Sequence, residues 1–195
     1  MGLYGTNTYL LQVGTDCLII DPAGRLSSLE KLLEDKKPLA ILLTHGHFDH
    51  IKGVDELYKK YQLPIYLHEA DFAMTDPVQQ QKHYAYNRLA HISAPLIALK
   101  EGKMCIGPFS FEVIHTPGHT AGSVCYLFGK DLFCGDTLFK GSIGRCDLYG
   151  GNDAAMKRSL RLLAQYDPEL ILHPGHQEES TLAEELKNNP FMRQL

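Results

Sequence analysis

Hydrophobic and polar positions in the first third of the chain change period repeatedly, from strand-like alternation to helical spacing and back. Two apolar runs flank Gly14-Thr15, a pair typical of a tight turn between strands. Leucines then recur at helical spacing ahead of a buried apolar run, and the helix-then-strand order repeats. The expected elements here are a hairpin over 7–13 and 16–20, a helix over 25–36, a strand over 38–43, a helix over 54–62 and a strand over 64–67.

The rest of the chain begins with a weakly patterned stretch, residues 69–100. A short helix is expected at 69–74, and the polar composition of 79–93 suggests a lid or an insertion. From Phe109 onward the strand pattern returns. The expected elements there are a strand over 109–114, a hairpin over 123–128 and 131–134, a helix over 154–165, a strand over 170–172 and a helix over 181–187. Strands and helices recur in both halves, which favours an α/β fold of two sheets with helices outside.

Length and composition fit one soluble domain spanning residues 1–195, large enough to bury a core. No apolar stretch approaches the roughly 20 residues of a membrane span, and the N-terminus lacks a signal-peptide pattern. We therefore expect a cytoplasmic protein without a membrane partner. The charge balance, 19 Lys and Arg against 23 Asp and Glu, contains no basic stripe, so no nucleic-acid partner is expected. The five cysteines include no C-x-x-C pair and are expected to be reduced, mostly buried thiols.

The most informative stretch is Thr44 to His50, which directly follows the strand expected at 38–43. It contains His45, His47, Asp49 and His50, and a set of His and Asp without Cys points to a catalytic metal site. In a helix, residues two apart face away from each other, so we expect a strand end that turns into a loop. Gly46 would give that loop its freedom. The alternative is a polar loop that is merely rich in histidine.

Three later residues occupy a similar setting, each preceded by Gly and following an expected strand. They are His119, Asp136 and His176. Taken singly, each could be an ordinary turn residue. Together with the first cluster they make five His and two Asp, enough ligands for two divalent ions. Zn is our first choice for these ions, and Fe or Mn also suits such ligands.

These motifs, in this order, resemble the metallo-β-lactamase superfamily. The residues concerned are Thr-His-x-His-x-Asp-His at 44–50, Thr-Pro-Gly-His-Thr at 116–120, Gly-Asp-Thr-Leu-Phe at 135–139 and Pro-Gly-His at 174–176. Residues 135–153 look most like the glyoxalase II (hydroxyacylglutathione hydrolase) branch. The resemblance implies a four-layer αββα sandwich with its site along one edge. It assigns His45, His47 and His119 to one metal, Asp49, His50 and His176 to a second, and Asp136 to the bridge between them.

The chemistry that this resemblance implies is hydrolysis of a small-molecule thioester by a hydroxide shared between two ions. A metal ion lowers the pKa of bound water from 15.7 to about 7, so no Ser or Cys nucleophile is needed. The second ion would stabilise the developing oxyanion. Asp136 would hold the two ions together, and Asp49 could accept or relay the proton.

Four further residues receive weaker assignments. Asp21 resembles a residue that orients a ligand imidazole, although a turn cap is an equal alternative. Thr116 could hydrogen-bond a ligand or simply suit a strand end. Lys140 and Arg145 are candidate substrate contacts; Arg145 matches a basic residue that holds glutathione in the family, but Asp147 stands where the family has Tyr. The C-terminal helical domain of full-length glyoxalase II has no counterpart here, so a short form is expected.

Several alternatives remain open. A persulfide dioxygenase of the same fold would use one iron on His45, His119 and Asp136. A β-lactamase is disfavoured because those enzymes generally place Cys where Asp136 stands and lack an equivalent of His50. A nuclease would need a basic face, and a non-catalytic metal-binding protein would not need seven ligands. The expectation is a binuclear hydrolase of a 2-hydroxyacyl thioester such as lactoylglutathione, with the thiol carrier, the metal and the oligomeric state left open.

Overall fold

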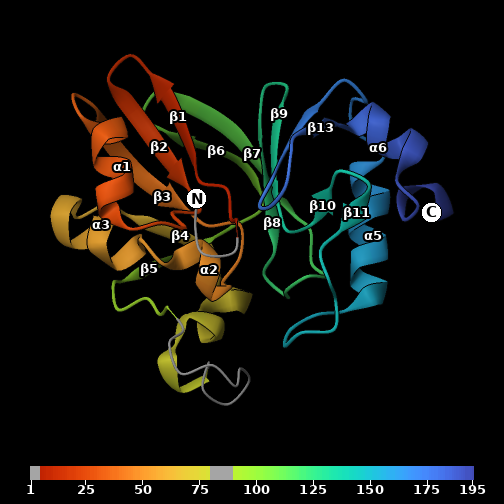
Figure 1. Ribbon diagram of the computed structural model, residues 1–195, viewed down its shortest axis with the longest axis horizontal. Coiled ribbons are helices and arrows are strands. Elements are labelled where there is room, and N and C mark those ends of the chain that lie inside the picture. The colour runs from red at the N-terminus through yellow and green to blue at the C-terminus, as the bar shows by residue number, and fades with distance from the viewer. Residues whose placement is uncertain (1–4, 80–89) are drawn as a thin grey trace.

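The computed structural model describes residues 5–79 and 90–195, and its first sheet contains five strands in the order β1-β2-β3-β4-β5 (Figure 1). The hairpin strands β1 and β2 pair antiparallel, and β2 to β5 run parallel to one another. The strands are β1 (Tyr9–Val13), β2 (Asp16–Ile20), β3 (Lys37–Leu42), β4 (Ile65–His68) and β5 (Leu96–Leu99).

The second sheet contains six strands in the order β13-β12-β9-β8-β7-β6. All its neighbours are antiparallel except β9 and β12, which run parallel. The strands are β6 (Gly102–Ile106), β7 (Phe109–His115), β8 (Val124–Phe128), β9 (Asp131–Gly135), β12 (Ile171–Pro174) and β13 (Ser180–Thr181). A separate small hairpin joins β10 (Leu138–Phe139) and β11 (Ser142–Ile143).

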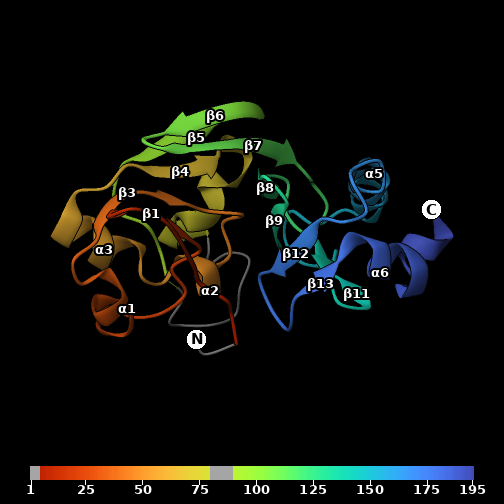
Figure 2. The same cartoon turned by 90° about the horizontal axis from the view of Figure 1, so that it is seen from above.

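Helices cover the outer face of each sheet, which gives the four layers αββα (Figure 2). The first sheet carries α1 (Leu26–Leu33) and α3 (Val54–Tyr61), and the second carries α5 (Asp153–Leu163) and α6 (Leu182–Asn188). One hydrophobic cluster lies under each helical layer and a third lies between the sheets. The expected αββα fold is therefore confirmed. Within the described part of the chain, no helix has the length and hydrophobicity needed to cross a membrane.

Strand β2 shows why the inner strands read as unbroken apolar runs. Leu18 and Ile20 belong to the cluster between the sheets, whereas Cys17 and Ile19 belong to the cluster under α1 and α3. Both faces of the strand are therefore buried, which removes the polar alternation of a half-exposed strand. Tyr126 crosses the space between the sheets, and its hydroxyl donates to the Leu43 carbonyl at 2.7 Å. This bond ties β8 to the segment that leads into the histidine-rich loop.

Most expected elements are present within a few residues of their expected bounds, and the differences have physical causes. The sequence pattern missed β5 and β6 because both are partly exposed; Ile97 on β5 is 43% exposed. The short helix expected at 69–74 is a 3₁₀ helix, η1 (Glu69–Thr75). Asp49 and His50 lie in a helical turn, α2 (Phe48–Ile51), where a loop was expected. Most of the lid or insertion expected at 79–93 falls on 80–89, outside the described residues.

Candidate metal centre

The histidine-rich segment leaves β3 at Leu42 and turns at the edge where the two sheets meet. His45 and His47 lie in the turn itself and are buried. Helix α2 begins immediately afterwards and contributes Asp49 and His50 from its single turn. Because adjacent helical residues point about 100° apart, Asp49 and His50 reach the same region from different directions. The single loop therefore supplies four candidate ligands.

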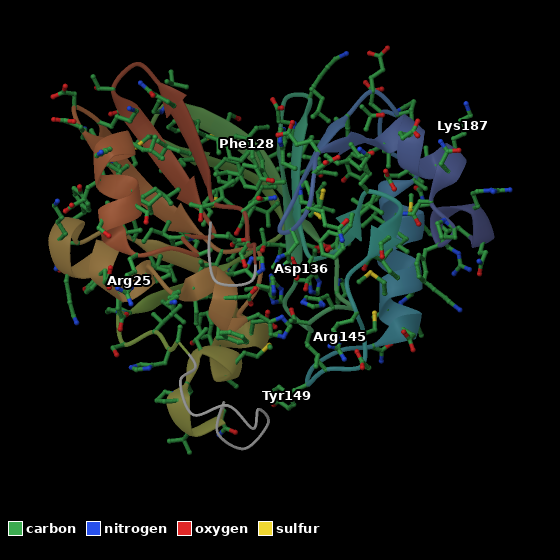
Figure 3. The ribbon with its side chains drawn as sticks, viewed as in Figure 1. Arg25, Phe128, Asp136, Arg145, Tyr149 and Lys187 are labelled. Carbon is green, nitrogen blue, oxygen red and sulfur yellow. The ribbon has the colours of Figure 1, made fainter. Side chains whose placement is uncertain are left out.

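The other three candidate ligands come from the second sheet. His119 follows β7, Asp136 follows β9 and His176 follows β12. Strands β9 and β12 are parallel neighbours, so their carboxyl ends lie at the same edge. Figure 3 shows Asp136 between the two halves of the molecule, with Arg145 and Tyr149 below it in this view. Sequence segments that are far apart thus meet at one edge of the sandwich.

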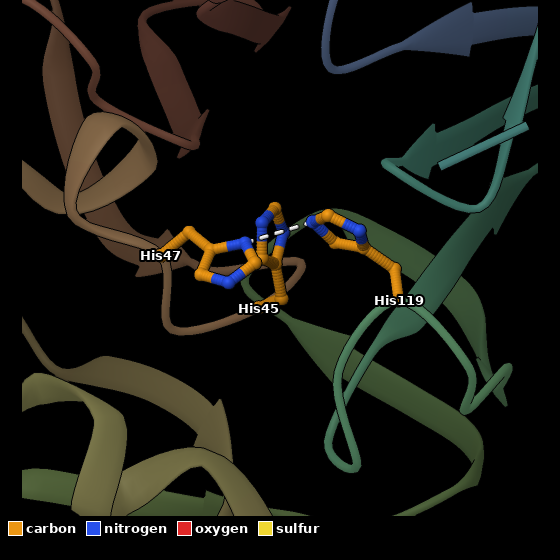
Figure 4. A group of neighbouring side chains, drawn as sticks. All are labelled: His45, His47 and His119. Atoms are coloured by element: carbon orange, nitrogen blue, oxygen red, sulfur yellow. Dashed lines mark hydrogen bonds between the residues drawn. The ribbon is translucent and has the colours of Figure 1, made fainter. Parts of the chain in front are cut away.

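His45, His47 and His119 form what we call the three-histidine group; their nitrogens lie within 4.8 Å of one another. The Nδ1 atom of His47 is 2.8 Å from the Nε2 atom of His119, across the boundary between the two sheets (Figure 4). Ring nitrogens converge at such distances when they share a proton or surround a cation.

Asp49, His50 and His176 form a second set, which we call the mixed group; their ligand atoms also lie within 4.8 Å of one another. His176 Nε2 is 3.3 Å from Asp49 Oδ2 and 3.4 Å from His50 Nε2. The set combines a carboxylate with two imidazoles. It therefore offers one more negative charge than the three-histidine group.

Asp136 lies between the two groups and is 8% exposed. Its Oδ2 atom is 3.4 Å from His119 Nε2 and 3.5 Å from His176 Nε2, while its Oδ1 atom is 3.3 Å from His50 Nε2. One carboxylate thus reaches members of both groups. Two neighbouring cations need an anionic group between them, and Asp136 occupies that place.

Hydrogen bonds on the far side of three rings determine which nitrogen carries the proton. His50 Nδ1 donates to Asp21 and His119 Nδ1 donates to the carbonyl oxygen of Arg145. Thr44 gives its hydroxyl proton to Asp21, so His45 Nδ1 donates to the Thr44 oxygen at 3.0 Å. In the neutral form of each ring, Nε2 is consequently left with a lone pair that faces the candidate site. This is the tautomer that a metal-binding imidazole requires.

The pKa values of the site divide the histidines into two kinds. Burial lowers the pKa of His45 far below its usual range and lowers the pKa of His47 to about 3, with neighbouring histidines adding to the effect. Burial also opposes protonation of His50 and His176, but Asp136 with Asp21 raises the pKa of His50, and Asp136 with Asp49 raises the pKa of His176 to about 9. In the absence of a metal, protons on these two rings offset the carboxylates.

The residues present fit a divalent cation in each group. The Nε2 atom of His45 is buried and has no hydrogen-bond partner among residues 5–79 and 90–195. A buried polar nitrogen without a partner is costly unless a ligand completes it. Imidazole nitrogens with carboxylate oxygens are the donor set of Zn, Fe and Mn sites. These clusters indicate a binuclear metal site.

The structure also places the four residues with weaker assignments. Asp21 accepts from Thr44 and from His50, so it orients a candidate ligand and does not merely cap a turn. Thr116 is buried, and its hydroxyl contacts Cys125 and Thr137 rather than a candidate ligand. The expectation that Thr116 might hydrogen-bond a ligand therefore has no support among its hydrogen bonds in the described residues.

The two candidate substrate contacts are both engaged in ion pairs. Arg145 pairs with Asp147 through two hydrogen bonds of 2.7 Å, and Lys140 pairs with Glu178 at 2.8 Å. All four side chains are largely exposed. Arg145 also contributes its main-chain oxygen to His119, a role that its residue type could not reveal.

Two further residues at the site carried no signal in the sequence. Thr6 is fully buried, and its hydroxyl donates to Asp49 Oδ2 at 2.8 Å. Asp71 is fully buried in η1 and accepts three hydrogen bonds from the loops beside the three-histidine group. Both residues stand in mixed polar segments, and no periodic pattern distinguishes them from surface positions. Only their spatial neighbours give them a role.

Histidines outside the candidate ligand set have other contacts. The two ring nitrogens of His173 each lie 2.8 Å from a carboxylate, Asp131 or Glu179. His68 and His115 stack on each other with ring centroids 4.3 Å apart. His83 lies outside the described residues. Cys146 is partly buried, and burial together with Asp153 raises its pKa to about 11, so its thiol is unreactive at neutral pH.

Comparison with proteins of known sequence gives matches along almost the whole chain. The chain is 37% identical to a "Probable metallo-hydrolase YqgX" of Bacillus subtilis, over 98% of this chain and 94% of that protein. It is also 37% identical to a "Hydroxyacylglutathione hydrolase" of Hamiltonella defensa, over 83% of this chain but only 57% of that protein. The chain therefore spans little more than half of that second relative.

Solved structures of similar proteins share the fold closely. "BLEG-1 B3 metallo-beta-lactamase" matches with a TM-score of 0.91 and 37% identity, over 98% of this chain and 96% of that one. TTHA1623 "in a di-iron-bound form" matches with a TM-score of 0.89 and 37% identity, over 98% and 97%. The model of the metallo-beta-lactamase superfamily matches residues 1–176, which include all seven candidate ligands. With its αββα layers and its paired His and Asp clusters, this chain belongs to the metallo-β-lactamase superfamily, whose fold supports metal-dependent hydrolysis.

Proposed function

We propose that this protein is a binuclear metallohydrolase that cleaves a small-molecule thioester of the hydroxyacylglutathione type. The observation that carries the proposal is the position of Asp136 between two complete ligand groups. The three-histidine group would hold one ion, the mixed group the other, and Asp136 would contact both. A single-metal chemistry would leave the mixed group without a purpose.

Two divalent ions in this site would supply an activated water near neutral pH and would stabilise negative charge on the substrate oxygen. The protein's own residues account for the rest. Asp21, Thr44 and the Arg145 carbonyl orient the rings by fixing their protons on Nδ1. The carboxylate of Asp49, whose pKa is lowered to about 2 by His176, His50 and Thr6 against the effect of burial, is an ionised acceptor at Oδ2.

The thioester is favoured over less reactive esters or amides because its leaving group needs little help. A thiol has a pKa near 8.5, so the thiolate departs without a strong general acid. The site histidines that remain neutral, His45 and His47, have low pKa values and could not serve as general acids near pH 7. The hydroxyacylglutathione hydrolase relative supports this substrate class, while the Arg145-Asp147 pair leaves the thiol carrier a separate question.

The test is hydrolysis of S-lactoylglutathione by the purified protein, with metal content measured on the same sample. We expect about two ions per chain and release of free thiol. His45→Ala and Asp136→Ala should each lower turnover by about 100-fold or more, since each removes a group that holds the reacting centre. Lys130→Ala is the control, because Lys130 lies on a surface turn and pairs with the exposed Glu169. Undiminished turnover in either site variant would contradict the mechanism.

A second candidate is hydrolysis of β-lactams, because a structure with 37% identity is titled a B3 metallo-beta-lactamase. This similarity favours β-lactam hydrolysis, whereas Asp136, which stands where β-lactamases generally have Cys, disfavours it. A chromogenic cephalosporin assayed beside the thioester separates the two functions. A far higher kcat/KM for the cephalosporin would replace the thioester proposal.

The dioxygenase alternative makes a different demand on the site. It would use one iron on His45, His119 and Asp136 and would consume O₂ with a persulfide substrate. The similarity to a di-iron-bound structure leaves the metal identity open, so iron alone does not discriminate. One iron per chain together with O₂ uptake on glutathione persulfide would favour the dioxygenase, and two ions without O₂ uptake would favour the hydrolase.

A further inference from the structure

Asp71 is a fully buried carboxylate near the candidate metal centre, and it is not one of the seven candidate ligands. It lies in η1, the 3₁₀ helix that follows β4 in the first sheet. Burying a carboxylate is expensive unless hydrogen bonds replace its lost hydration. The partners of Asp71 therefore identify what the buried charge holds in place.

Three donors from two different loops surround this carboxylate. Its Oδ2 atom accepts from the main-chain N–H of Gly46 at 2.9 Å and from the Thr120 hydroxyl at 2.6 Å. Its Oδ1 atom accepts from the main-chain N–H of Gly122 at 2.7 Å. These three partners all donate, which matches the acceptor-only chemistry of an ionised carboxylate.

The proton order in this network is fixed by a fourth residue. The Ser123 hydroxyl is 2.8 Å from the Thr120 hydroxyl and accepts from the Thr120 main-chain N–H at 3.1 Å. Because Thr120 gives its own hydroxyl proton to Asp71, Ser123 donates to Thr120. Every donor in the chain thus has one acceptor. Such a fully satisfied network holds its members in one arrangement.

The two loops held by Asp71 are the ones that carry the three-histidine group. Gly46 stands between His45 and His47 in the loop after β3. Thr120 directly follows His119 in the loop between β7 and β8. Asp71 therefore joins the main chain between His45 and His47 to the hydroxyl of the residue after His119, across the boundary where His47 and His119 lie 2.8 Å apart.

Close packing at the glycines shows that the loops fit against this carboxylate. A Cβ atom at Gly122 would lie 2.6 Å from Asp71 Cγ, and one at Gly46 would lie 3.0 Å from the Asp71 carbonyl oxygen. Real Cβ atoms do not approach carbon atoms to 2.6 Å. The absence of a side chain at position 122 lets the main chain reach the carboxylate.

Asp21 provides a comparison within the same site. It accepts from Thr44 and from His50, and so orients a member of the mixed group. Among its hydrogen-bond partners in the described residues, Asp71 has none in the mixed group. Asp21 thus bonds a ligand ring directly, whereas Asp71 bonds the loops that carry the three-histidine group.

We propose that Asp71 is a positioning residue for the three-histidine group, fixing the His45-His47 loop relative to His119 and so setting the affinity of that group for its ion. The proposal rests on the binuclear site of the proposed function. Asp71 acts through two main-chain N–H groups and the Thr120 hydroxyl, and would contact neither ion nor substrate. Partners of this kind typically change metal affinity about 10- to 100-fold when removed.

The test measures zinc retention by the full-length zinc-loaded protein in competition with a chromophoric chelator. His47→Ala and Asp49→Ala identify the ions held by the three-histidine and mixed groups. Asp71→Asn keeps the volume but replaces one accepting oxygen by an amide N–H₂, which then faces the Gly122 donor or the Gly46 and Thr120 donors. We expect Asp71→Asn to lower the affinity for the ion that His47→Ala loses by about 10- to 100-fold. The affinity for the other ion should stay at the wild-type value.

Glu185→Gln is the matched control, because Glu185 is also buried and accepts from three donors, Ser180, Gly141 and Asn189. It should lower thermal stability without changing zinc affinity at the three-histidine group. If Asp71→Asn does not fold, Thr120→Val removes one of the three hydrogen bonds. It should lower the affinity of the three-histidine group for its ion by a smaller factor. Thr120→Ser keeps the hydroxyl and should therefore keep the wild-type affinity for that ion.

The outcomes separate the two proposals. Three results would overturn the role of Asp71 while leaving the binuclear site intact. They are a wild-type zinc affinity in Asp71→Asn, an equal loss of affinity for both ions in that variant, and the same loss of affinity in Glu185→Gln. A wild-type protein that holds fewer than two ions would overturn the binuclear site and, with it, the role of Asp71. Where Thr120 variants replace Asp71→Asn, equal affinity in Thr120→Val and Thr120→Ser would overturn the role of Asp71.

Discussion

His119 donates from Nδ1 to the main-chain oxygen of Arg145 at 2.7 Å, although 26 positions separate the two residues. The loop whose side chain is a candidate substrate contact therefore also orients a candidate ligand. The main chain and the side chain of Arg145 have separate tasks. Substitution of the side chain can test one task without removing the other.

Arg145→Ala should leave metal content unchanged, because the carbonyl that His119 uses remains. If the guanidinium holds an anionic substrate, KM for lactoylglutathione should rise about tenfold, the value of one charge-assisted hydrogen bond, with kcat little changed. Asp147→Ala should have the opposite effect on KM, because it removes the carboxylate that pairs with Arg145. Steady-state kinetics with metal analysis checks both. An unchanged KM in both variants would exclude Arg145 as a substrate contact.

Asp21→Asn should weaken metal binding about 10- to 100-fold, since Asp21 fixes the proton of His50 on Nδ1. Asn tolerates the left-handed backbone that Asp21 adopts, with φ of 47°, so the change acts mainly on the hydrogen bonds. Chelator competition measures the effect. Asp16→Asn is the control, because Asp16, at the start of β2, forms an ion pair with the exposed Lys37 at 3.9 Å. Equal metal affinity in the two variants would contradict the prediction.

Tyr126→Phe should lower the free energy of unfolding by about 1–3 kcal/mol, the usual cost of leaving a buried polar group without its partner. The Tyr126 side chain is fully buried between the sheets, and its hydroxyl bonds the Leu43 carbonyl at 2.7 Å. Urea unfolding of the two proteins gives the difference. Tyr166→Phe is the matched control, because its hydroxyl contacts Glu112 in a part-buried position at 3.2 Å and should cost less. A larger loss in Tyr166→Phe would contradict this ranking.

Alkylation of Cys146 should be slow at neutral pH and should accelerate up to about pH 11. Burial, followed by the nearby carboxylates of Asp153 and Asp147, raises the pKa of this thiol to about 11, and only the thiolate reacts. Below that pH the thiolate fraction, and so the rate, should rise about tenfold per pH unit. Iodoacetamide labelling followed by peptide mass spectrometry measures it in a Cys105→Ser background, because Cys105 is exposed. A rate that levels off between about pH 9 and 10 would show an ordinary thiol with a pKa near 8.5.

Local sequence patterns predicted the long elements well because their burial is regular. Strand β2 is buried on both faces and reads as an apolar run, and α5 places Met156, Leu160 and Leu163 on one buried face. β5 escaped prediction because its burial depends on its neighbour β4 and on no pattern of its own. The helical turn at Asp49 and His50 was missed because two ligands seven and eight residues past the end of β3 fit a loop equally well.

The sequence by itself determined the kind of chemistry, since seven His and Asp residues in short motifs after strand ends have few other uses. It also determined the layered fold, because the periodicity of each segment fixes which face must be buried. The tertiary structure decided how those ligands divide into two groups and which buried partners hold them. Thr6, Asp71 and the carbonyl of Arg145 act through contacts between segments 25 to 51 positions apart. Such contacts depend on how the two sheets meet, and no local pattern of side chains encodes that.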